Sequence, residues 1–238
     1  MNIMIIGCGK MGRLIAETAA LHKDMNVILT ADRLTYPDIL HFDGDTDVVI
    51  DFSHPDNLDW IYDYIKEKGC AYICGTTGFS EEQTEKIQSL SQYAPVVFQS
   101  NFSYGIAVLK EILEMVTPML EESFDIEIIE KHHNLKQDAP SGTAKTLAEV
   151  INKGNSYKEV HGRCGFTGPR GKEIGIHAVR GGTVAGEHTV LFLGDNENIE
   201  ITHTAASKQI FVNGALRAAL FAVGRKPGMY TMKDILFH

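Results

Sequence analysis

The chain has 238 residues, of which 44% are hydrophobic and 22% charged, and its formal net charge is −9 at pH 7. This length fits one or two domains and can bury a core without disulfides or metal ions. The excess of acidic residues excludes a protein that coats nucleic acid, which would need a basic face. We find no run of the roughly 20 apolar residues that span a bilayer and no signal-peptide core, so we expect a cytoplasmic protein without a membrane partner.

The cysteines indicate reduced thiols rather than a metal or redox site. Cys8, Cys70, Cys74 and Cys164 form no C-x-x-C pair and have no histidine partner at metal-ligand spacing. A cytoplasmic protein with such scattered cysteines keeps them as free thiols. Redox or zinc chemistry is the less favoured alternative.

The first hundred residues alternate short apolar runs with helical patterns. We predict strands at residues 1–6, 26–30, 48–52, 71–74 and 95–98, and helices at 11–21, 57–68 and 81–91. Ser80 is placed to cap the third helix, with Glu81 and Glu82 in its first turn. This alternation is typical of a Rossmann-type, doubly wound parallel sheet, which binds ligands at the carboxyl ends of its strands. We therefore predict an α/β chain that begins with a nucleotide-binding sheet.

The pattern changes after Asn101. We predict strands at 124–130, 173–179, 187–193 and 198–204, a helix at 143–152, a glycine-rich stretch at 162–171, and a last amphipathic helix at 211–223. Longer strands with fewer helices between them indicate a second, α+β domain on a mixed or antiparallel sheet. We assign 1–102 plus 212–238 to dinucleotide binding, and 103–211 to substrate binding and oligomerisation.

A complete G-x-G-x-x-G motif, Gly7-Cys8-Gly9-Lys10-Met11-Gly12, lies between the first strand and the first helix. Its glycines permit a tight turn, close approach to a pyrophosphate, and close helix–strand packing. Asp32 follows Gly12 by 20 residues, where a carboxylate accepts hydrogen bonds from ribose hydroxyls; the alternative is a surface aspartate. Arg33 can pair with a 2′-phosphate. We expect NADH to be accepted and leave NADPH open.

Two further loops end predicted strands on the same edge. Gly75-Thr76-Thr77-Gly78 follows the fourth strand, and Gln99-Ser100-Asn101-Phe102 follows the fifth. Backbone amides and small hydroxyls there suit ribose and nicotinamide, although such loops are often plain turns. We take Gly75, Thr76, Thr77 and the second loop as candidate cofactor contacts.

The stretch from Glu130 to Ala144 carries the densest chemistry. Lys131, His132, His133 and Lys136 put two imidazoles and two ammonium groups into six residues of an acidic chain. Ser141-Gly142-Thr143 follows at a predicted helix start, where unpaired amides attract an anion. Histidine is the commonest general acid or base near neutral pH. The stretch predicts a dicarboxylate receptor with a proton donor.

Two other interpretations of this stretch are open. Adjacent histidines in a loop can be simply solvated, beside an N-capped turn. A metal site at His132 and His133 is less favoured, because neighbouring strand residues point to opposite faces and no third ligand sits at metal spacing.

The N-terminal G-x-G-x-x-G, the G-T-T-G-F and S-N-F-S loops and, above all, H-H-x-x-K-x-D-A-P-S-G-T-A resemble the dihydrodipicolinate reductase family. The resemblance runs from residue 3 to about 236 and includes Arg180-Gly181-Gly182 and Gly186-Glu187-His188. It implies hydride transfer from NADH or NADPH to a cyclic unsaturated imine dicarboxylate of lysine (diaminopimelate) biosynthesis. It also implies a homotetramer.

The resemblance assigns roles to residues of this chain. His132 and Lys136 would be the proton donors, and His133, Ser141, Gly142 and Thr143 would bind substrate. Residues 7–12, Asp32, Arg33, Gly75, Thr76, Thr77 and 99–102 would contact the nucleotide. The 18 residues between Asp32 and Asp51 are fewer than in longer members. Alternatives are another nicotinamide-dependent reductase, acting on an amino or keto acid, and a non-catalytic dinucleotide sensor.

Overall fold

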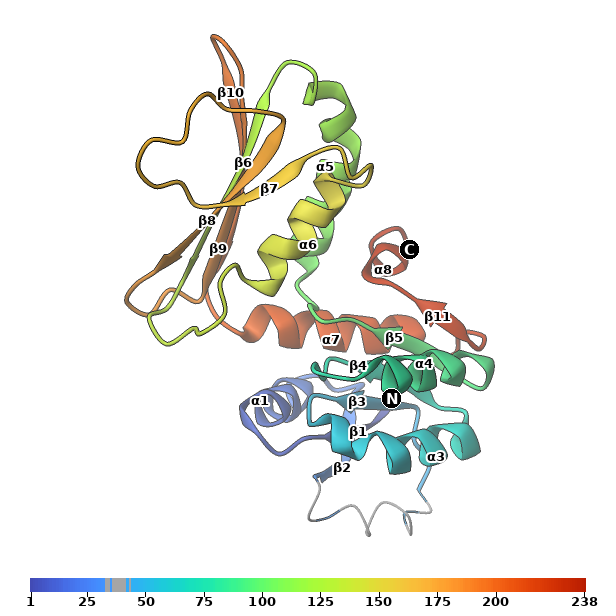
Figure 1. Cartoon of the computed structure of the whole chain (residues 1–238). Helices are drawn as coiled ribbons and strands as arrows, with labels where there is room; N and C mark the ends of the chain where they lie inside the picture. Colours follow the sequence, from blue (N-terminus) through green and yellow to red (C-terminus); the bar gives the residue numbers. More distant parts are fainter. Residues whose placement is uncertain (33–34, 36–41, 43) are drawn as a thin grey trace. The chain divides into compact units, whose positions relative to one another are not determined.

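The computed structural model describes residues 1–32, 35, 42 and 44–238, and it divides into two compact units (Figure 1). The first unit comprises Met1–Tyr104 and Gln209–His238, and the second comprises Gly105–Lys208. Each unit has its own sheet and its own buried apolar core. The last thirty residues of the chain therefore return to the N-terminal unit.

The sheet of the first unit is parallel throughout, as predicted. Its strands are β1 (Asn2–Ile6), β2 (Asn26–Ala31), β3 (Val48–Asp51), β4 (Ala71–Cys74), β5 (Pro95–Phe98) and β11 (Gly228–Tyr230), in the order β11-β5-β4-β3-β1-β2. The strand order reverses at β1, which makes the boundary between β1 and β3 the switch point where such sheets bind ligands.

Five α-helices among the described residues accompany this sheet: α1 (Lys10–Ala19), α3 (Leu58–Lys68), α4 (Glu81–Ser89), α7 (Gln209–Ala222) and α8 (Met232–Leu236). Short 3-10 turns occupy Pro55–Asn57 and Leu90–Gln92. The predicted Ser80 cap is confirmed as a capping box, in which Ser80 and Gln83 each accept the other's backbone N–H. Gly214 lets α7 pack against the chain at Phe102, because a Cβ there would lie 1.7 Å from the Phe102 carbonyl oxygen.

The second unit contains a mixed sheet, again as predicted. It comprises β6 (Asp125–His132), β7 (Lys158–His161), β8 (Glu173–Arg180), β9 (Gly186–Leu193) and β10 (Asn198–Ala205), in the order β10-β9-β6-β8-β7. The pairs of β8 with β6 and β7 are parallel, and those of β9 with β6 and β10 are antiparallel. Helices α5 (Tyr104–Leu120) and α6 (Gly142–Ile151) cover one face of this sheet (Figure 1).

Four elements were not expected from the sequence: α5, β7, β11 and α8. The sequence analysis did not predict α5, because its exposed Val108, Met115 and Met119 obscure the buried stripe of the helix. β7 is a polar edge strand, and β11 has only three residues. β11 pairs with β5, so the tail after α7 completes the nucleotide-type sheet (Figure 1).

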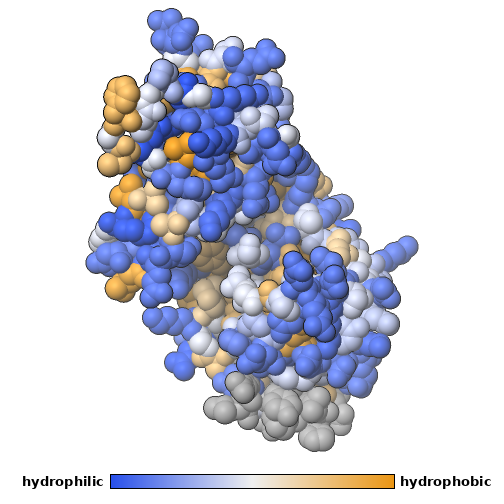
Figure 2. All heavy atoms as spheres, viewed as in Figure 1, coloured by the Kyte–Doolittle hydropathy of each residue, from blue (hydrophilic) through white to orange (hydrophobic). Residues whose placement is uncertain are grey.

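The surface visible in Figure 2 is mostly hydrophilic, with apolar residues in small groups. The large aliphatic side chains lie mainly in the two cores. Within the described part of the chain, every helix is too short or too polar to cross a bilayer. All four cysteines are free.

Candidate functional site

The glycine motif forms a tight turn between β1 and α1. Gly7 has φ +111°, and a Cβ there would lie 2.4 Å from the Phe52 carbonyl oxygen. A Cβ on Gly12 would lie 1.7 Å from the Gly7 carbonyl oxygen, whereas the Cβ position of Gly9 has open space within 4 Å. Gly9 caps α1 without a side-chain hydrogen bond. The backbone at the start of α1 is therefore open to an incoming pyrophosphate.

Asp32 follows β2 and faces this turn. Its backbone N–H donates to Thr35 Oγ1 over 2.9 Å. Burial, and next a hydrogen bond with the Asp32 carboxylate, raise the pKa of the Cys8 thiol. A carboxylate beside the glycine turn has the position that ribose recognition requires. Lys10 is exposed, and Arg33 lies outside the described residues.

Two adjoining hollows open at the carboxyl ends of the strands. One, of about 490 Å³, is lined by Met11 and by the segments after β3 and β4, including Ser53, Gly75 and Thr77. The other, of about 370 Å³, shares Thr77 and reaches the segment after β5: Thr76, Thr77, Gly78, Phe79, Thr84, Phe98, Gln99 and Ser100. The predicted loops at Gly75 and Gln99 thus line one continuous edge of the sheet.

The buried carboxylate of Asp51 anchors the segments after β3 and β4 by hydrogen bonds. Asp51, 1% exposed at the end of β3, accepts hydrogen bonds from Tyr72 Oη (2.8 Å), Ser53 Oγ (2.6 Å) and Thr76 Oγ1 (2.9 Å). Burial raises the pKa of Asp51, and these hydroxyl groups oppose the rise. The Ser53 N–H donates to Thr76 Oγ1 over 2.7 Å. The Thr76 side chain therefore faces inward, while Thr77 is exposed.

The segment after β5 also combines inward and outward groups. Phe102 is 1% exposed, and its ring lies 5.6 Å from that of Phe52, centroid to centroid. Asn101 Oδ1 accepts the Ser103 N–H over 2.8 Å. Ser100 is exposed and Gln99 half-buried. In this segment Gln99 and Ser100 line the hollow, and Phe102 supports it from the core.

In the second unit, β6 ends in a buried acid–imidazole pair. Glu130 is 0% exposed, and its Oε2 lies 2.6 Å from His132 Nδ1. Arg180, from β8, donates Nη1 to Oε2 and Nη2 to Oε1, each over 2.7 Å. The Ser141 N–H donates to Oε1 over 3.0 Å. These donors lower the pKa of Glu130 against the opposing effect of its burial, and Glu130 raises the pKa of Arg180.

A second buried histidine supports the first. His188, on β9, stacks edge-on against His132 with ring centroids 5.1 Å apart. Its Nε2 lies 3.0 Å from Ser141 Oγ, which accepts the Ala144 N–H over 3.2 Å. Burial, and next the neighbouring His132, lower the pKa of His188 to about 4. His188 is therefore an uncharged imidazole at neutral pH.

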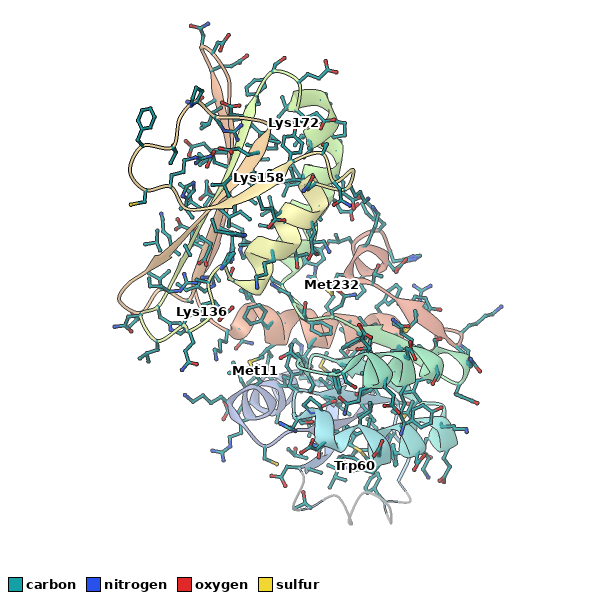
Figure 3. All side chains as sticks on the ribbon, in the orientation of Figure 1. Met11, Trp60, Lys136, Lys158, Lys172 and Met232 are labelled. Atoms are coloured by element: carbon teal, nitrogen blue, oxygen red, sulfur yellow. The ribbon has the colours of Figure 1, made fainter. Side chains whose placement is uncertain are left out.

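The remaining predicted residues of the stretch follow β6. Lys136 Nζ donates to Asp138 Oδ1 over 2.8 Å, and Figure 3 labels Lys136 on the loop between β6 and α6. His133 is half-buried, and its Nδ1 has no hydrogen-bond partner among the described residues. Gly142 and Thr143 form the first turn of α6, and the Cβ position of Gly142 is open. Cationic groups and a helix start thus belong to one segment of the second unit.

The sequence analysis did not assign a functional role to Glu130, Arg180 or His188. The spacing of Glu130 and His132 on a strand puts both on one face, a signal visible in the sequence. Arg180 joins them because β6 and β8 pair with His132 opposite Arg180, which is a long-range register. Among the described residues no group of three or more potential ligands is placed to bind a metal ion.

A parallel sheet with a glycine turn at the end of its first strand, followed by a second unit on a mixed sheet, is the architecture of a Rossmann-type oxidoreductase. The model of the family "Dihydrodipicolinate reductase, N-terminus" matches residues 1–102, and that of "Dihydrodipicolinate reductase, C-terminus" matches residues 105–236. The chain belongs to the dihydrodipicolinate reductase family.

Individual relatives agree with this assignment. The chain is 42% identical over 248 residues to the 4-hydroxy-tetrahydrodipicolinate reductase of Clostridium novyi (strain NT), covering 99% of this chain and 98% of that protein. The solved structure of a dipicolinate-bound dihydrodipicolinate reductase from Paenisporosarcina sp. TG-14 has a TM-score of 0.80 at 21% identity, with 97% of each chain covered. GenD2 from gentamicin A biosynthesis, solved with NAD, has a TM-score of 0.57 at 13% identity, covering 99% of this chain and 90% of that one. These two structures share the fold.

Proposed function

We propose that 4-hydroxy-tetrahydrodipicolinate loses water to give its unsaturated imine, and that the chain transfers a hydride from a reduced nicotinamide nucleotide to this imine, giving tetrahydrodipicolinate in the diaminopimelate route to lysine. The observation that carries this function is the buried Glu130–His132 pair, which is hydrogen-bonded to the start of α6 at Ser141. It combines a proton donor with an anion-binding helix end in a member of this family.

Several groups of the first unit support the binding of a nicotinamide nucleotide in this proposal. Open backbone at Gly9 suits the pyrophosphate, and Asp32 beside Cys8 suits the adenosine ribose. The hollows along Gly75, Thr77 and Gln99 suit the nicotinamide half. When bound, the reduced nucleotide supplies the hydride. Thr76 and Phe102 support these contacts from behind, because their side chains are buried.

The second unit supplies the positive charge that a dicarboxylate requires. In our proposal the two carboxylates are bound by His133, Lys136, the backbone N–H of Gly142 and the neighbouring Thr143. The α6 dipole favours the negative charge of these carboxylates at the N-terminus of the helix. Ser141 acts here as a positioning residue. Its N–H is donated to Glu130, and its hydroxyl is used by Ala144 and His188.

Hydride addition at the far end of the conjugated imine moves an electron pair toward the ring nitrogen and the adjacent carbon, and one proton completes the product. Cationic groups that hold this charge more tightly than the starting imine lower the barrier. His132 Nε2 and Lys136 Nζ are the two candidate donors. Lys136 is bound to the exposed Asp138 carboxylate, whose pKa it lowers.

A coupled assay tests the function. The unstable substrate is generated in place from pyruvate and aspartate semialdehyde by the preceding synthase, and loss of reduced-nicotinamide absorbance is followed with each cofactor. We expect turnover with NADH, since the Asp32 carboxylate repels a 2′-phosphate. Absence of turnover with both cofactors contradicts the proposal. Cofactor binding without turnover on any imine would favour a dinucleotide sensor, and turnover of an amino or keto acid alone would favour another dehydrogenase.

We also propose a cytoplasmic homotetramer. The free cysteines suit a reducing compartment. On the sheet face opposite α5 and α6, Val179 is 47% exposed, and Ile129 and Leu191 are half-buried. Burying such a face between copies is the usual solution for an open sheet. Sedimentation velocity at micromolar concentration measures the mass of the assembly; a monomer at all concentrations contradicts the proposal.

A further inference from the structure

We propose that Glu130 is a positioning residue that keeps a proton on His132 Nδ1, so that Nε2 is the nitrogen that takes up a second proton, giving the imidazolium, and then passes that proton to the substrate. The role of His132 in that proton transfer rests on the proposed function. The position of the Nδ1 proton does not, because it follows from the hydrogen bonds of the second unit alone.

Each oxygen of Glu130 receives two donors. Oε1 accepts from the Ser141 N–H and Arg180 Nη2, and Oε2 accepts from Arg180 Nη1 and His132 Nδ1. An ionised carboxylate only accepts hydrogen bonds, so the contact at 2.6 Å requires the proton to be on Nδ1. A carboxylate at Nδ1 fixes the tautomer and orientation of a catalytic imidazole in the same way in hydrolytic triads.

The neighbouring imidazole of His188 places no second positive charge beside the His132 ring. His188 contacts the ring edge-on and is uncharged, so it adds no competing positive charge. Gly186 lies beside Nε2, where a Cβ would come within 3.1 Å of that nitrogen. His132 is 9% exposed overall, and its Nδ1 side is the one occupied by Glu130.

The Glu130 carboxylate also connects the His132 imidazole to the N-terminus of α6, where we propose that a substrate carboxylate binds. Oε1 holds the Ser141 N–H, and Ser141 is the N-cap of α6. Arg180 extends the connection, because its Nη2 also donates to the Asp138 carbonyl oxygen over 2.7 Å. One buried group therefore sets the position of both the proton donor and the start of the anion site.

Glu130→Gln tests the role. An amide NH₂ at the Oε1 position would oppose two donors, the Ser141 N–H and Arg180 Nη2, whereas at the Oε2 position it opposes Arg180 Nη1 alone. The NH₂ therefore takes the Oε2 position and faces His132. Only a deprotonated Nδ1 can accept that N–H, so the neutral imidazole changes to the Nε2–H form. ¹⁵N NMR of histidine-labelled, substrate-free protein reads the tautomer, with His132 assigned through His132→Gln. We expect the tautomer change and a fall in kcat of about 100-fold or more, with nucleotide binding retained.

Glu127→Gln is the matched control. Glu127 is also on β6, is 8% exposed, and accepts from Arg163 Nη2 (2.8 Å), Arg170 Nε (3.3 Å) and His177 Nε2 (2.7 Å). Its substitution removes a comparable ionic cluster, and we expect lower stability with the His132 tautomer and kcat unchanged. A similar kcat loss in this control, or an Nδ1–H tautomer in Glu130→Gln, overturns the proposal.

If Glu130→Gln does not fold, Arg180→Lys provides the test. It keeps the Glu130 charge but replaces the forked contact with a single ammonium group. We expect the Nδ1–H tautomer to persist while kcat falls about tenfold, because the carboxylate is held less rigidly. Loss of the Nδ1–H tautomer in this variant contradicts the proposal. Absence of turnover in the wild-type protein would instead reject the proposed function and leave the tautomer measurement interpretable.

Discussion

Gly186 on β9 provides the space that the imidazole of His132 on β6 occupies. A Cβ at position 186 would come within 3.1 Å of His132 Nε2 and 3.5 Å of Cδ2. The glycine is buried and its φ does not require glycine, so the lack of a side chain is needed for space and not for backbone conformation. The two residues are therefore coupled sterically at the nitrogen that we assign to proton transfer.

Gly186→Ala should move the imidazole by a few tenths of an ångström. Misplacement of a reacting group by about 1 Å can cost 100-fold, so we expect kcat to fall about tenfold while the affinity for reduced nucleotide is unchanged. Steady-state kinetics and a nucleotide titration measure the two effects. Gly154→Ala is the control, because its Cβ position is open and the residue lies after α6. Equal activities of the two variants would contradict the steric role.

Substitutions of Lys136 separate charge from proton donation. Lys136→Ala should lower kcat by about 10²- to 10⁴-fold and raise KM for the imine, with nucleotide binding unaffected. Lys136→Arg keeps the charge but cannot release a proton near neutral pH, so KM should recover and kcat should not.

Lys158→Ala is the control for the loss of one positive charge from the second unit. Lys158 is exposed on β7, at the end of the mixed sheet opposite the loop that carries Lys136 (Figure 3). Its substitution should leave both constants unchanged. Recovery of kcat in Lys136→Arg would leave His132 as the sole candidate donor.

The fold of the first unit could be predicted because its signals are local. Gly7, Gly9 and Gly12 follow one strand and precede one helix, and each has a distinct steric role in the structure. The strands beyond them are short apolar runs, which indicates burial on both faces. β11 escaped prediction because a three-residue strand has no periodicity, and its pairing with β5 is a long-range contact.

The second unit was predicted only in part. The stretch containing His132 and Lys136 was found from the clustering of charges, which is visible in sequence. Arg180 could not be connected with Glu130 without the register of β6 and β8, which brings residues 50 positions apart into contact. The apolar residues of α5 lie on several sides of the helix, so its buried stripe at Ile106, Leu109 and Leu113 was not separated from them.

Asp32→Ala tests the ribose contact. Loss of a charge-assisted hydrogen bond costs about 1.5–3 kcal/mol, so we expect Kd for NADH to rise at least about tenfold. Removing the carboxylate also removes its repulsion of a 2′-phosphate, so affinity for NADPH should rise relative to NADH. Fluorescence titration with both nucleotides measures this change. Glu17→Ala, on the exposed side of α1, neutralises one charge in the same unit and should change neither Kd. An unchanged NADH affinity in Asp32→Ala would contradict the assignment.

The buried His188 should make the folded state sensitive to mild acid. Its pKa is lowered from 6.5 to about 4, chiefly by burial, so between these values the unfolded chain binds a proton that the folded chain does not. Stability is therefore complete above pH 6.5 and falls as the pH decreases toward 4, by about 3 kcal/mol in total. Burial also lowers the pKa of His203, which adds loss in the same direction. The pKa of Glu127 is lowered from 4.5 to about 2, so its contribution to the free energy of unfolding is lost only below pH 4.5.

Urea unfolding of His188→Gln between pH 7 and pH 4.5 isolates this contribution. The variant keeps a polar group beside Ser141 but cannot take up a proton, so its free energy of unfolding should fall less steeply with acid than that of the wild type. His161→Gln is the control, because the His161 side chain is 53% exposed on β7 and pairs with Glu159. It should keep the wild-type slope. Identical slopes for His188→Gln and the wild type would show that folding does not lower the pKa of His188, and burial of this imidazole could then not explain the acid sensitivity.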